Sequence, residues 1–225
     1  MNEITIGKAR MLNGDCMEFM RDIPDNYYEL SICDPPYGIG VSNSSKLSGT
    51  SKKEYKIKNW DNAIPDISYF KELKRVSKNQ IIWGANYLGL QGGAIVWNKL
   101  GTRIGYRKNM PTFSDCEIAY CSLINNVKMF SYTQIGNVYG NDYLVDWNQS
   151  RIHPTQKPIA LYEWLLTNYA KTGDKILDTH GGSFSSAIAC NNLGFEFTGI
   201  ELDLDYYDAA VKRVKAANQQ IRMFA

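Results

Sequence analysis

The tetrapeptide Asp34-Pro35-Pro36-Tyr37 carries the clearest chemical signal in this sequence. It follows the apolar run from Leu30 to Cys33, which predicts a short strand with the tetrapeptide at its carboxyl end. Consecutive prolines hold a turn extended and stiff, which suits a fixed array of hydrogen-bond acceptors. The aspartate and a proline carbonyl can hold the hydrogens of an exocyclic amine and aim its lone pair at a donor. The tyrosine can stack on a base that has left its duplex.

A second candidate half-site lies near the end of the chain. Asp178-Thr179-His180-Gly181-Gly182-Ser183 follows the predicted strand Lys175 to Leu177, and Glu201 comes 23 residues after Asp178. An acid at about this distance holds ribose hydroxyls in nucleoside-binding α/β units. The turn lacks the GxGxxG pattern that cradles a pyrophosphate, so it disfavours a dinucleotide. The pair predicts an adenosine-containing cofactor, and the alternative is an ordinary strand-to-helix turn followed by a surface glutamate.

The elements around these two turns alternate between strand and helix. In the last third we expect helices over Tyr162 to Tyr169, ended by Gly173, over Ser185 to Asn192, ended by Gly194, and over Asp205 to Ala217, with a strand over Phe195 to Ile200. Earlier we expect a helix over Pro65 to Ser77 and strands over Gln80 to Trp83, Gly93 to Trp97 and Glu117 to Cys121. This order predicts an α/β fold with right-handed crossovers. The polar stretch 130–151 is either a long loop or a small insert.

Composition places few limits on the function. The 225 residues suit one domain, and a net charge of +2 does not indicate a nucleic-acid partner. Five lysines lie between Lys46 and Lys58 against the single acid Glu54, which predicts either a solvated mobile loop, about 41–60, or a loop that meets phosphates. The five cysteines show no CxxC spacing and only two histidines are present, so we expect no metal site. With no signal peptide or membrane span in the sequence, we expect a cytoplasmic protein.

Taken in order, these motifs resemble the amino-methyltransferases of DNA, which modify adenine N6 or cytosine N4. The matching segments are Asp34 to Gly38, His153-Pro154-Thr155-Gln156-Lys157-Pro158, Asp178 to Ser183, and Glu201. The catalytic tetrapeptide comes before the cofactor turn, which looks like the permuted beta class. The resemblance covers nearly the whole chain and is weakest at 130–151, the place of the family's target-recognition region. It implies one domain over 1–225 with a Rossmann-like S-adenosylmethionine-dependent fold, a mostly parallel twisted sheet with helices on both faces.

The resemblance also implies roles for residues. The reaction would move a methyl group from S-adenosylmethionine to adenine N6 in a specific sequence of double-stranded DNA, after base flipping. Asp15 would contact the cofactor adenine, Glu201 its ribose, and the Asp178 turn its methionine part. The implied catalytic residues are Asp34, Pro35, Pro36 and Tyr37, and the implied cofactor-binding residues are Asp15, Cys16, Asp34, His153, Thr155, Lys157, Asp178, Gly181, Ser183 and Glu201. The DNA-binding candidates are Lys52, Lys53, Lys56 and Lys99, and Trp97 to Lys99 and Phe113 to Tyr120 resemble segments that hold the flipped base.

One position departs from the family pattern. The family turn usually reads Gly-Ser-Gly, whereas this chain has Gly182-Ser183-Phe184. Because phenylalanine adopts a positive φ with difficulty, we expect Phe184 either in an ordinary helical conformation or with its ring turned into the core. The turn amides of Gly182 and Ser183 would then face the ligand.

Several alternatives stay open. An aspartate at the head of the tetrapeptide favours adenine N6, because cytosine-N4 members more often have serine there. Cytosine-N4 methylation, methylation of RNA adenine, and a catalytically silent nucleic-acid-binding module with the same fold are the other hypotheses. The family resemblance allows a homodimer and a partner restriction nuclease, but it predicts neither.

Overall fold

The computed structural model describes residues 1–43, 54–100, 114–135, 138–141, 144–146 and 151–224. Its helices are α1 (Cys16–Arg21), α2 (Ile67–Val76), α3 (Ala85–Leu88), α4 (Ile159–Tyr169), α5 (Ser185–Leu193) and α6 (Leu204–Phe224), with a 3₁₀ turn at Val41–Asn43. Its strands are β1 (Asn2–Ile6), β2 (Ala9–Asn13), β3 (Tyr28–Cys33), β4 (Ser77–Trp83), β5 (Gly93–Asn98), β6 (Cys116–Cys121), β7 (Val127–Ser131), β8 (Thr133–Ile135), β9 (Val138–Asn141), β10 (Leu144–Asp146), β11 (Lys175–Asp178) and β12 (Glu196–Glu201).

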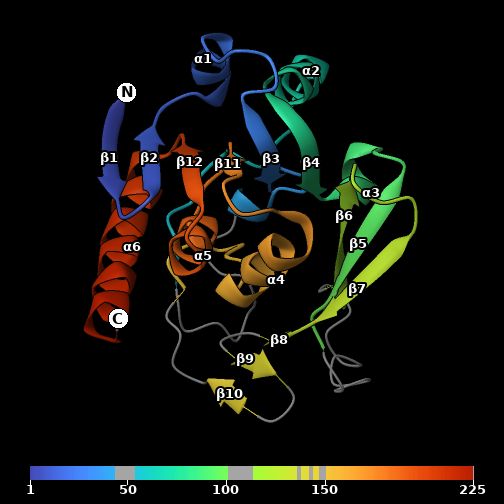
Figure 1. The fold of residues 1–225 in the computed structure, drawn as a ribbon. Helices are drawn as coiled ribbons and strands as arrows, with labels where there is room; N and C mark the ends of the chain where they lie inside the picture. Colours follow the sequence, from blue (N-terminus) through green and yellow to red (C-terminus); the bar gives the residue numbers. More distant parts are fainter. Residues whose placement is uncertain (44–53, 101–113, 136–137, 142–143, 147–150, 225) are drawn as a thin grey trace.

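Most of these strands form one twisted sheet (Figure 1). Among the described residues it has nine strands in the order β1-β2-β12-β11-β3-β4-β6-β5-β7. Five adjacent strands are parallel to one another, namely β2, β12, β11, β3 and β4. In contrast, β1 and β6 run antiparallel to their neighbours. The chain leaves β3 toward β4 on one side and leaves β11 toward β12 on the other. A topological switch point therefore lies between β3 and β11, where α/β sheets bind ligands.

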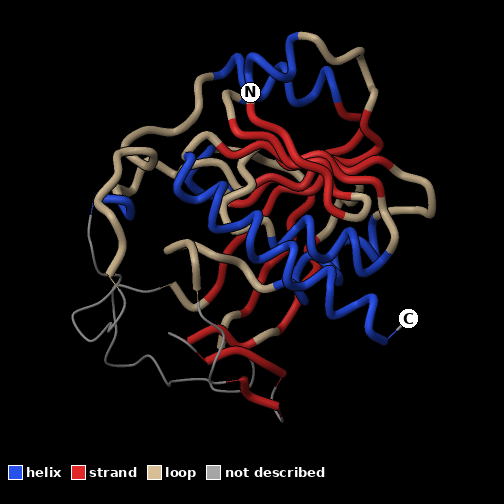
Figure 2. The backbone as a smooth tube through the Cα atoms, turned by 90° about the vertical axis from the view of Figure 1, so that its left-hand side faces the viewer, coloured by secondary structure: helices blue, strands red, loops and turns tan. Residues whose placement is uncertain are grey.

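Helices cover both faces of the sheet (Figure 2). On one face, α4, α5 and α6 pack in a core that includes Leu165, Ile188 and Val214. On the other face, α1 and α2 pack through Met20 and Leu73. The predicted Rossmann-like α/β fold with a mostly parallel sheet is therefore confirmed.

Local patterns located most elements correctly, although α1, α3 and β7 were not predicted. Three further differences concern one hairpin and the ends of two helices. The hairpin β1-β2 was not predicted from the sequence, and its turn uses Gly7 at φ 63°. Helix α4 ends at Tyr169, and Gly173 lies in the following turn with φ 92°. Helix α6 continues to Phe224, beyond the expected end at Ala217.

The stretch 130–151 contains more structure than its polar sequence indicates. Its described parts complete β7 and form a separate sheet in the order β10-β9-β8, which lies beyond the end of the main sheet in Figure 1. Its role in target recognition stays a prediction.

No helix in the described part of the chain is long and apolar enough to cross a membrane. Likewise, no three His, Cys, Asp or Glu side chains of the described residues gather in a way that could hold a metal ion.

Candidate active site

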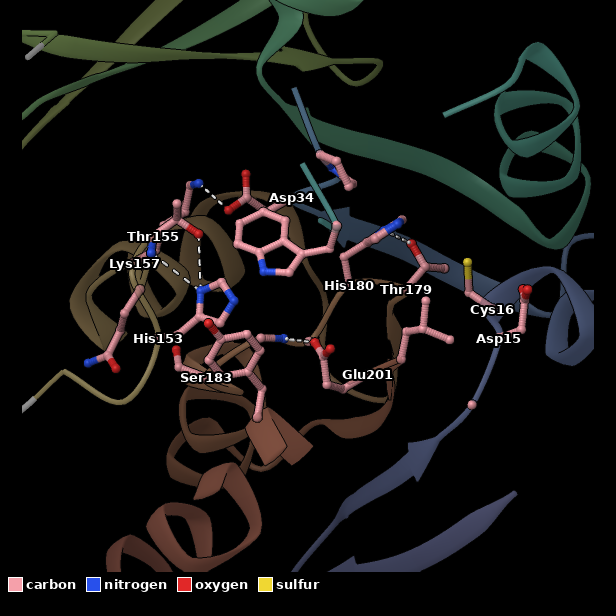
Figure 3. Close-up of a pocket in the computed structure, with 18 of the residues that line it drawn as sticks. Asp15, Cys16, Asp34, His153, Thr155, Lys157, Thr179, His180, Ser183 and Glu201 are labelled. Carbon is pink, nitrogen blue, oxygen red and sulfur yellow. Dashed lines mark hydrogen bonds and ion pairs between the residues drawn. The ribbon is translucent and has the colours of Figure 1, made fainter. Parts of the chain in front are cut away.

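A cavity of about 280 Å³ opens at the switch point of the sheet. Asp34 reaches it from the end of β3, and Glu201 reaches it from the end of β12 (Figure 3). The two half-sites of the sequence therefore meet in one place. Ten of the predicted site residues line the cavity, namely Asp15, Cys16, Asp34, Pro36, His153, Thr155, Lys157, Gly181, Ser183 and Glu201. Pro35, Tyr37 and Asp178 do not line it.

Glu201 presents a buried carboxylate to this cavity, with the whole residue only 9% exposed. Its two oxygens accept hydrogen bonds from the backbone N–H groups of Gly182, at 2.7 Å, and Asp203, at 2.8 Å. Burial raises the pKa of Glu201 to about 7, although these two backbone hydrogen bonds lower it. Each carboxylate oxygen has a second lone pair. Hydroxyl donors from a ligand would therefore add to the stabilisation of the ionised form.

Asp178 organises the turn from below and does not face the ligand space. Its oxygens accept hydrogen bonds from the Ser186 hydroxyl at 2.6 Å and from the His180 backbone N–H at 3.1 Å. Burial raises its pKa to about 7, and the same two hydrogen bonds lower it. Asp178 thus supports the Gly181-Gly182-Ser183 turn, and its predicted contact with the cofactor stays a prediction. The Gly182 amide differs from the expectation, because it donates to Glu201.

The other wall of the cavity is aromatic. The His153 ring packs between Trp60, with ring centroids 5.2 Å apart, and Tyr206, at 4.3 Å. Burial lowers the pKa of His153 to about 3, so the ring is neutral near pH 7. Its Nδ1 contacts the Thr155 hydroxyl at 3.1 Å. A neutral aromatic wall of this kind can hold the flat, uncharged ring of an adenine.

The entrance to α1 contributes an acid and a thiol. Asp15 is the N-cap of α1, and its carboxylate accepts the Met17 backbone N–H at 2.7 Å. Cys16 follows it, and burial raises the pKa of its thiol to about 12. Together with Glu201, these groups offer acceptors for hydroxyls and amines next to an aromatic wall. This set of groups fits an adenosine cofactor that carries an amino acid.

Asp34 is held by two partners at the other end of the cavity. Its Oδ1 accepts a hydrogen bond from the Tyr37 hydroxyl at 2.5 Å, and its Oδ2 forms an ion pair with the Lys157 ammonium (Figure 3). The Tyr37 ring stacks on Tyr87, with centroids 5.2 Å apart and planes 13° apart. In this structure one face of the Tyr37 ring is therefore covered by Tyr87 and is not open to a flipped base.

Phe184 stands where the family turn usually has glycine, and the structure shows how the turn accommodates it. It has φ 50° and ψ 39°, so the expected ordinary helical conformation is wrong. Its ring is 0% exposed and packs edge-on against Phe197, so the other expectation, a ring in the core, is confirmed. A Cβ atom on Gly181 or Gly199 would lie about 2.5 Å or less from this ring, because both glycines leave room for it. Phe184 does not line the cavity.

The sequence alone did not reveal Asp61. This buried side chain accepts the backbone N–H groups of Tyr37 at 2.8 Å and Gly38 at 3.0 Å through Oδ1, and that of Val41 at 2.9 Å through Oδ2. It therefore fixes the chain that leaves the tetrapeptide. The preceding residue, Trp60, lines the cavity. The only sequence signal was an isolated acid at the end of a lysine-rich stretch, which indicates no partner.

The structure revises the DNA-binding candidates. Lys52 and Lys53 lie outside the described residues. The exposed Lys56 ammonium lies 2.9 Å from Asp205, in a surface ion pair that phosphate can displace. The Lys99 side chain is only 17% exposed and pairs with Glu117, and its contact with DNA stays a prediction. Trp97 is also in the core, 1% exposed, where its Nε1 donates to the Tyr132 carbonyl.

Comparisons with known proteins agree with this geometry. The model of the N6/N4 methyltransferase family, described as DNA methylase, matches residues 122–212. The chain is similar to the type II methyltransferase M.HinfI of Haemophilus influenzae, with 25% identity over 252 residues that cover 91% of this chain and 68% of that protein. It is also similar to the methylase YubD of Escherichia coli (strain K12), with 24% identity over 231 residues that cover 96% and 95%.

Solved structures show the same fold. The complex of M1.HpyAVI with S-adenosylmethionine aligns with a TM-score of 0.53 at 19% identity, and covers 91% of this chain and 99% of that one. The cytosine-N4-specific PvuII DNA methyltransferase aligns with a TM-score of 0.57 at 13% identity, and covers 95% and 92%.

Proposed function

Because the chain belongs to the DNA amino-methyltransferase family, we propose that it methylates the N6 amine of adenine in double-stranded DNA. Its cofactor is S-adenosylmethionine, the ligand of the M1.HpyAVI complex and the group that fits the cavity. The observation that carries the adenine target is Asp34, a carboxylate at the head of the proline turn that borders the cavity. An aspartate at this position favours adenine N6, because cytosine-N4 members of the family more often have serine there.

The residues divide between holding the cofactor and holding the base. Glu201, Asp15 and the His153 wall hold the adenosine, and Gly181 and Ser183 border the space for the amino-acid part. The bound cofactor supplies a methyl group that is activated by its attachment to a sulfonium. An amine that accepts a methyl group develops positive charge and loses a proton. The Asp34 carboxylate lowers the energy of that state because it is fixed and partly shielded from water.

The target is tested by product analysis. The purified protein is incubated with methyl-tritiated S-adenosylmethionine and unmethylated genomic DNA, and the DNA is then digested to nucleosides. We expect the label in N6-methyldeoxyadenosine. Label in N4-methyldeoxycytidine would overturn the adenine target, and label only in a parallel RNA sample would overturn DNA as substrate. Unlabelled nucleic acid, together with intact cofactor binding, would instead identify a silent binding module.

Glu201→Ala is expected to weaken the binding of S-adenosylhomocysteine by about 10- to 100-fold, because a charged acceptor of ligand hydroxyls is lost. Since burial raises the pKa of Glu201 to about 7, wild-type affinity should also rise as the pH passes through that value, when the carboxylate ionises. This rise should vanish in the variant. Calorimetric titration measures both effects.

The matched control is Asn13→Ala. Asn13 donates to the backbone carbonyls of Glu201 and Leu202, at the same junction but outside the cavity. The control should retain the wild-type affinity and its pH dependence. Equal losses in both variants would mean that Glu201 acts by shaping the turn and does not contact the cofactor.

A further inference from the structure

Four charged side chains, Lys99, Glu117, Lys157 and Asp34, form a continuous line that ends at the proposed catalytic carboxylate. Lys99 pairs with Oε1 of Glu117, Lys157 lies 3.0 Å from Oε2 of Glu117, and Lys157 also pairs with Oδ2 of Asp34. These four come from four separate parts of the chain, at the ends of β5 and β3, on β6, and before α4. Two ammonium groups and two carboxylates alternate, so the line carries no net charge.

The Lys157 ammonium lies at the centre of this line, and its surroundings favour the charged form. Its side chain is only 3% exposed, and its Nζ lies 5.4 Å from the centre of the Trp83 ring and 5.8 Å from that of Tyr37. Aromatic faces attract a cation, and the two carboxylates offset the cost of its burial. Burial lowers the pKa of Lys157, but Asp34 and Glu117 outweigh it, so the pKa lies above its ordinary value.

The same contacts act on the two acids. Burial raises the pKa of Glu117, but Lys157 and Lys99 outweigh it and lower the pKa to about 2. Burial raises the pKa of Asp34 too, and here Lys157 lowers it while Glu117 raises it again. The net pKa of Asp34 lies above its ordinary value. Lys157 is therefore the main contact that opposes protonation of Asp34, and the hydrogen bond from Tyr37 adds a smaller contribution in the same direction.

We propose that Lys157 is a positioning residue that presents the Asp34 carboxylate, ionised and fixed in orientation, to the amine of the target base. Glu117 holds Lys157 in place, and Lys99 balances Glu117. This role rests on the proposed methyl transfer to a base amine. It differs from the sequence prediction, in which Lys157 binds the cofactor. Although Lys157 borders the cavity, both of its ion pairs point to protein carboxylates.

The test uses two variants and one control. Lys157→Met keeps the length of the side chain and removes its charge. Because it leaves two buried acids with one lysine, a second variant, Lys157→Met with Glu117→Gln, removes one charge of each sign and keeps the site neutral. The control is Lys78→Met, which breaks an exposed ion pair with Glu29 far from the site.

The first readout is the pH profile of single-turnover methyl transfer. We expect the acidic limb of Lys157→Met to move up by about 1–3 pH units, because Asp34 loses the charge that favours its ionised form. The double variant should move in the same direction but less, since the repulsion from Glu117 is also removed. The groups that face Asp34 are Lys157, Tyr37 and Glu117, with Asp178 and Tyr162 further within electrostatic range. An unmoved limb in both variants would overturn the proposal.

The second readout does not depend on activity. In protein labelled with ¹³C at aspartate carboxyls, the Asp34 signal is identified by its loss in Asp34→Asn, and its titration is followed by NMR. We expect the Asp34 titration to shift up by about 1–3 pH units in Lys157→Met and to stay unchanged in Lys78→Met. An upward shift supports the proposal even if the nucleoside analysis overturns adenine as the target. An unchanged Asp34 titration overturns it whatever the methylation assay shows.

Cofactor binding separates the two roles of Lys157. If Lys157 acts through Asp34, Lys157→Met should change the dissociation constant of S-adenosylhomocysteine by less than about threefold. A loss of tenfold or more with an unmoved pH limb would return Lys157 to the cofactor contact and overturn the positioning role.

Discussion

Asp34→Ala is expected to lower the single-turnover rate of methyl transfer by about 10²-fold or more while leaving cofactor affinity within a few-fold of the wild type. The carboxylate lies at the end of β3, and Glu201 and Asp15, which we propose hold the adenosine, follow other strands. In the proposed mechanism Asp34 acts on the amine and not on the donor. A fixed acceptor that works only in the transition state has a rate effect of this size.

The alanine variant also leaves Lys157 without one of its two partners, which lowers stability. Asp34→Asn keeps the volume and one acceptor, so it should fold better and lose less activity than Asp34→Ala. The exposed Asp208→Ala on α6 is the matched control and should retain the full rate. Thermal unfolding of all three accompanies the kinetics. Near-normal turnover by a folded Asp34→Ala would exclude Asp34 as the catalytic acceptor.

Phe184→Gly is expected to lower the free energy of unfolding by about 1–4 kcal/mol. Removing a fully buried phenylalanine ring costs about 3–5 kcal/mol, and relief of the left-handed conformation returns about 1–2 kcal/mol. The ring is 0% exposed and fills the space beside Gly181 and Gly199. Since it does not line the cavity, affinity for S-adenosylmethionine should stay within about threefold of the wild type.

A comparison of alanine and glycine isolates the backbone contribution. At Phe184, where φ is 50°, the glycine variant should be more stable than the alanine variant by about 1 kcal/mol. At Phe197, a strand residue that packs against the same ring, the order should reverse because glycine weakens a strand. Denaturant unfolding gives the four values. If only Phe184→Gly binds the cofactor and the wild type does not, the ring blocks the site and the enzyme assignment fails.

The two turns of the site could be located from the sequence because each follows a short apolar strand. Asp34 and Glu201 come directly after the runs Leu30 to Cys33 and Phe195 to Ile200, and the carboxyl ends of parallel strands meet at one edge of the sheet. Burial of a strand produces a local pattern that can be read without the fold. The hairpin β1-β2 was missed because its strands have no such clear pattern, and β1 is held by pairing with β2.

The sequence by itself therefore determined the α/β class and the adenosine-type cofactor, because each depends on residues that are close together in the chain. Only the tertiary structure decided which charges meet. Lys157 lies 123 residues from Asp34, and Asp61 lies 24 residues from the Tyr37 amide that it accepts. The room for the Phe184 ring likewise comes from Gly199 on another strand. Such contacts follow from the path of the backbone in space. Neither the spacing of motifs nor the periodicity of apolar residues along the chain indicates them.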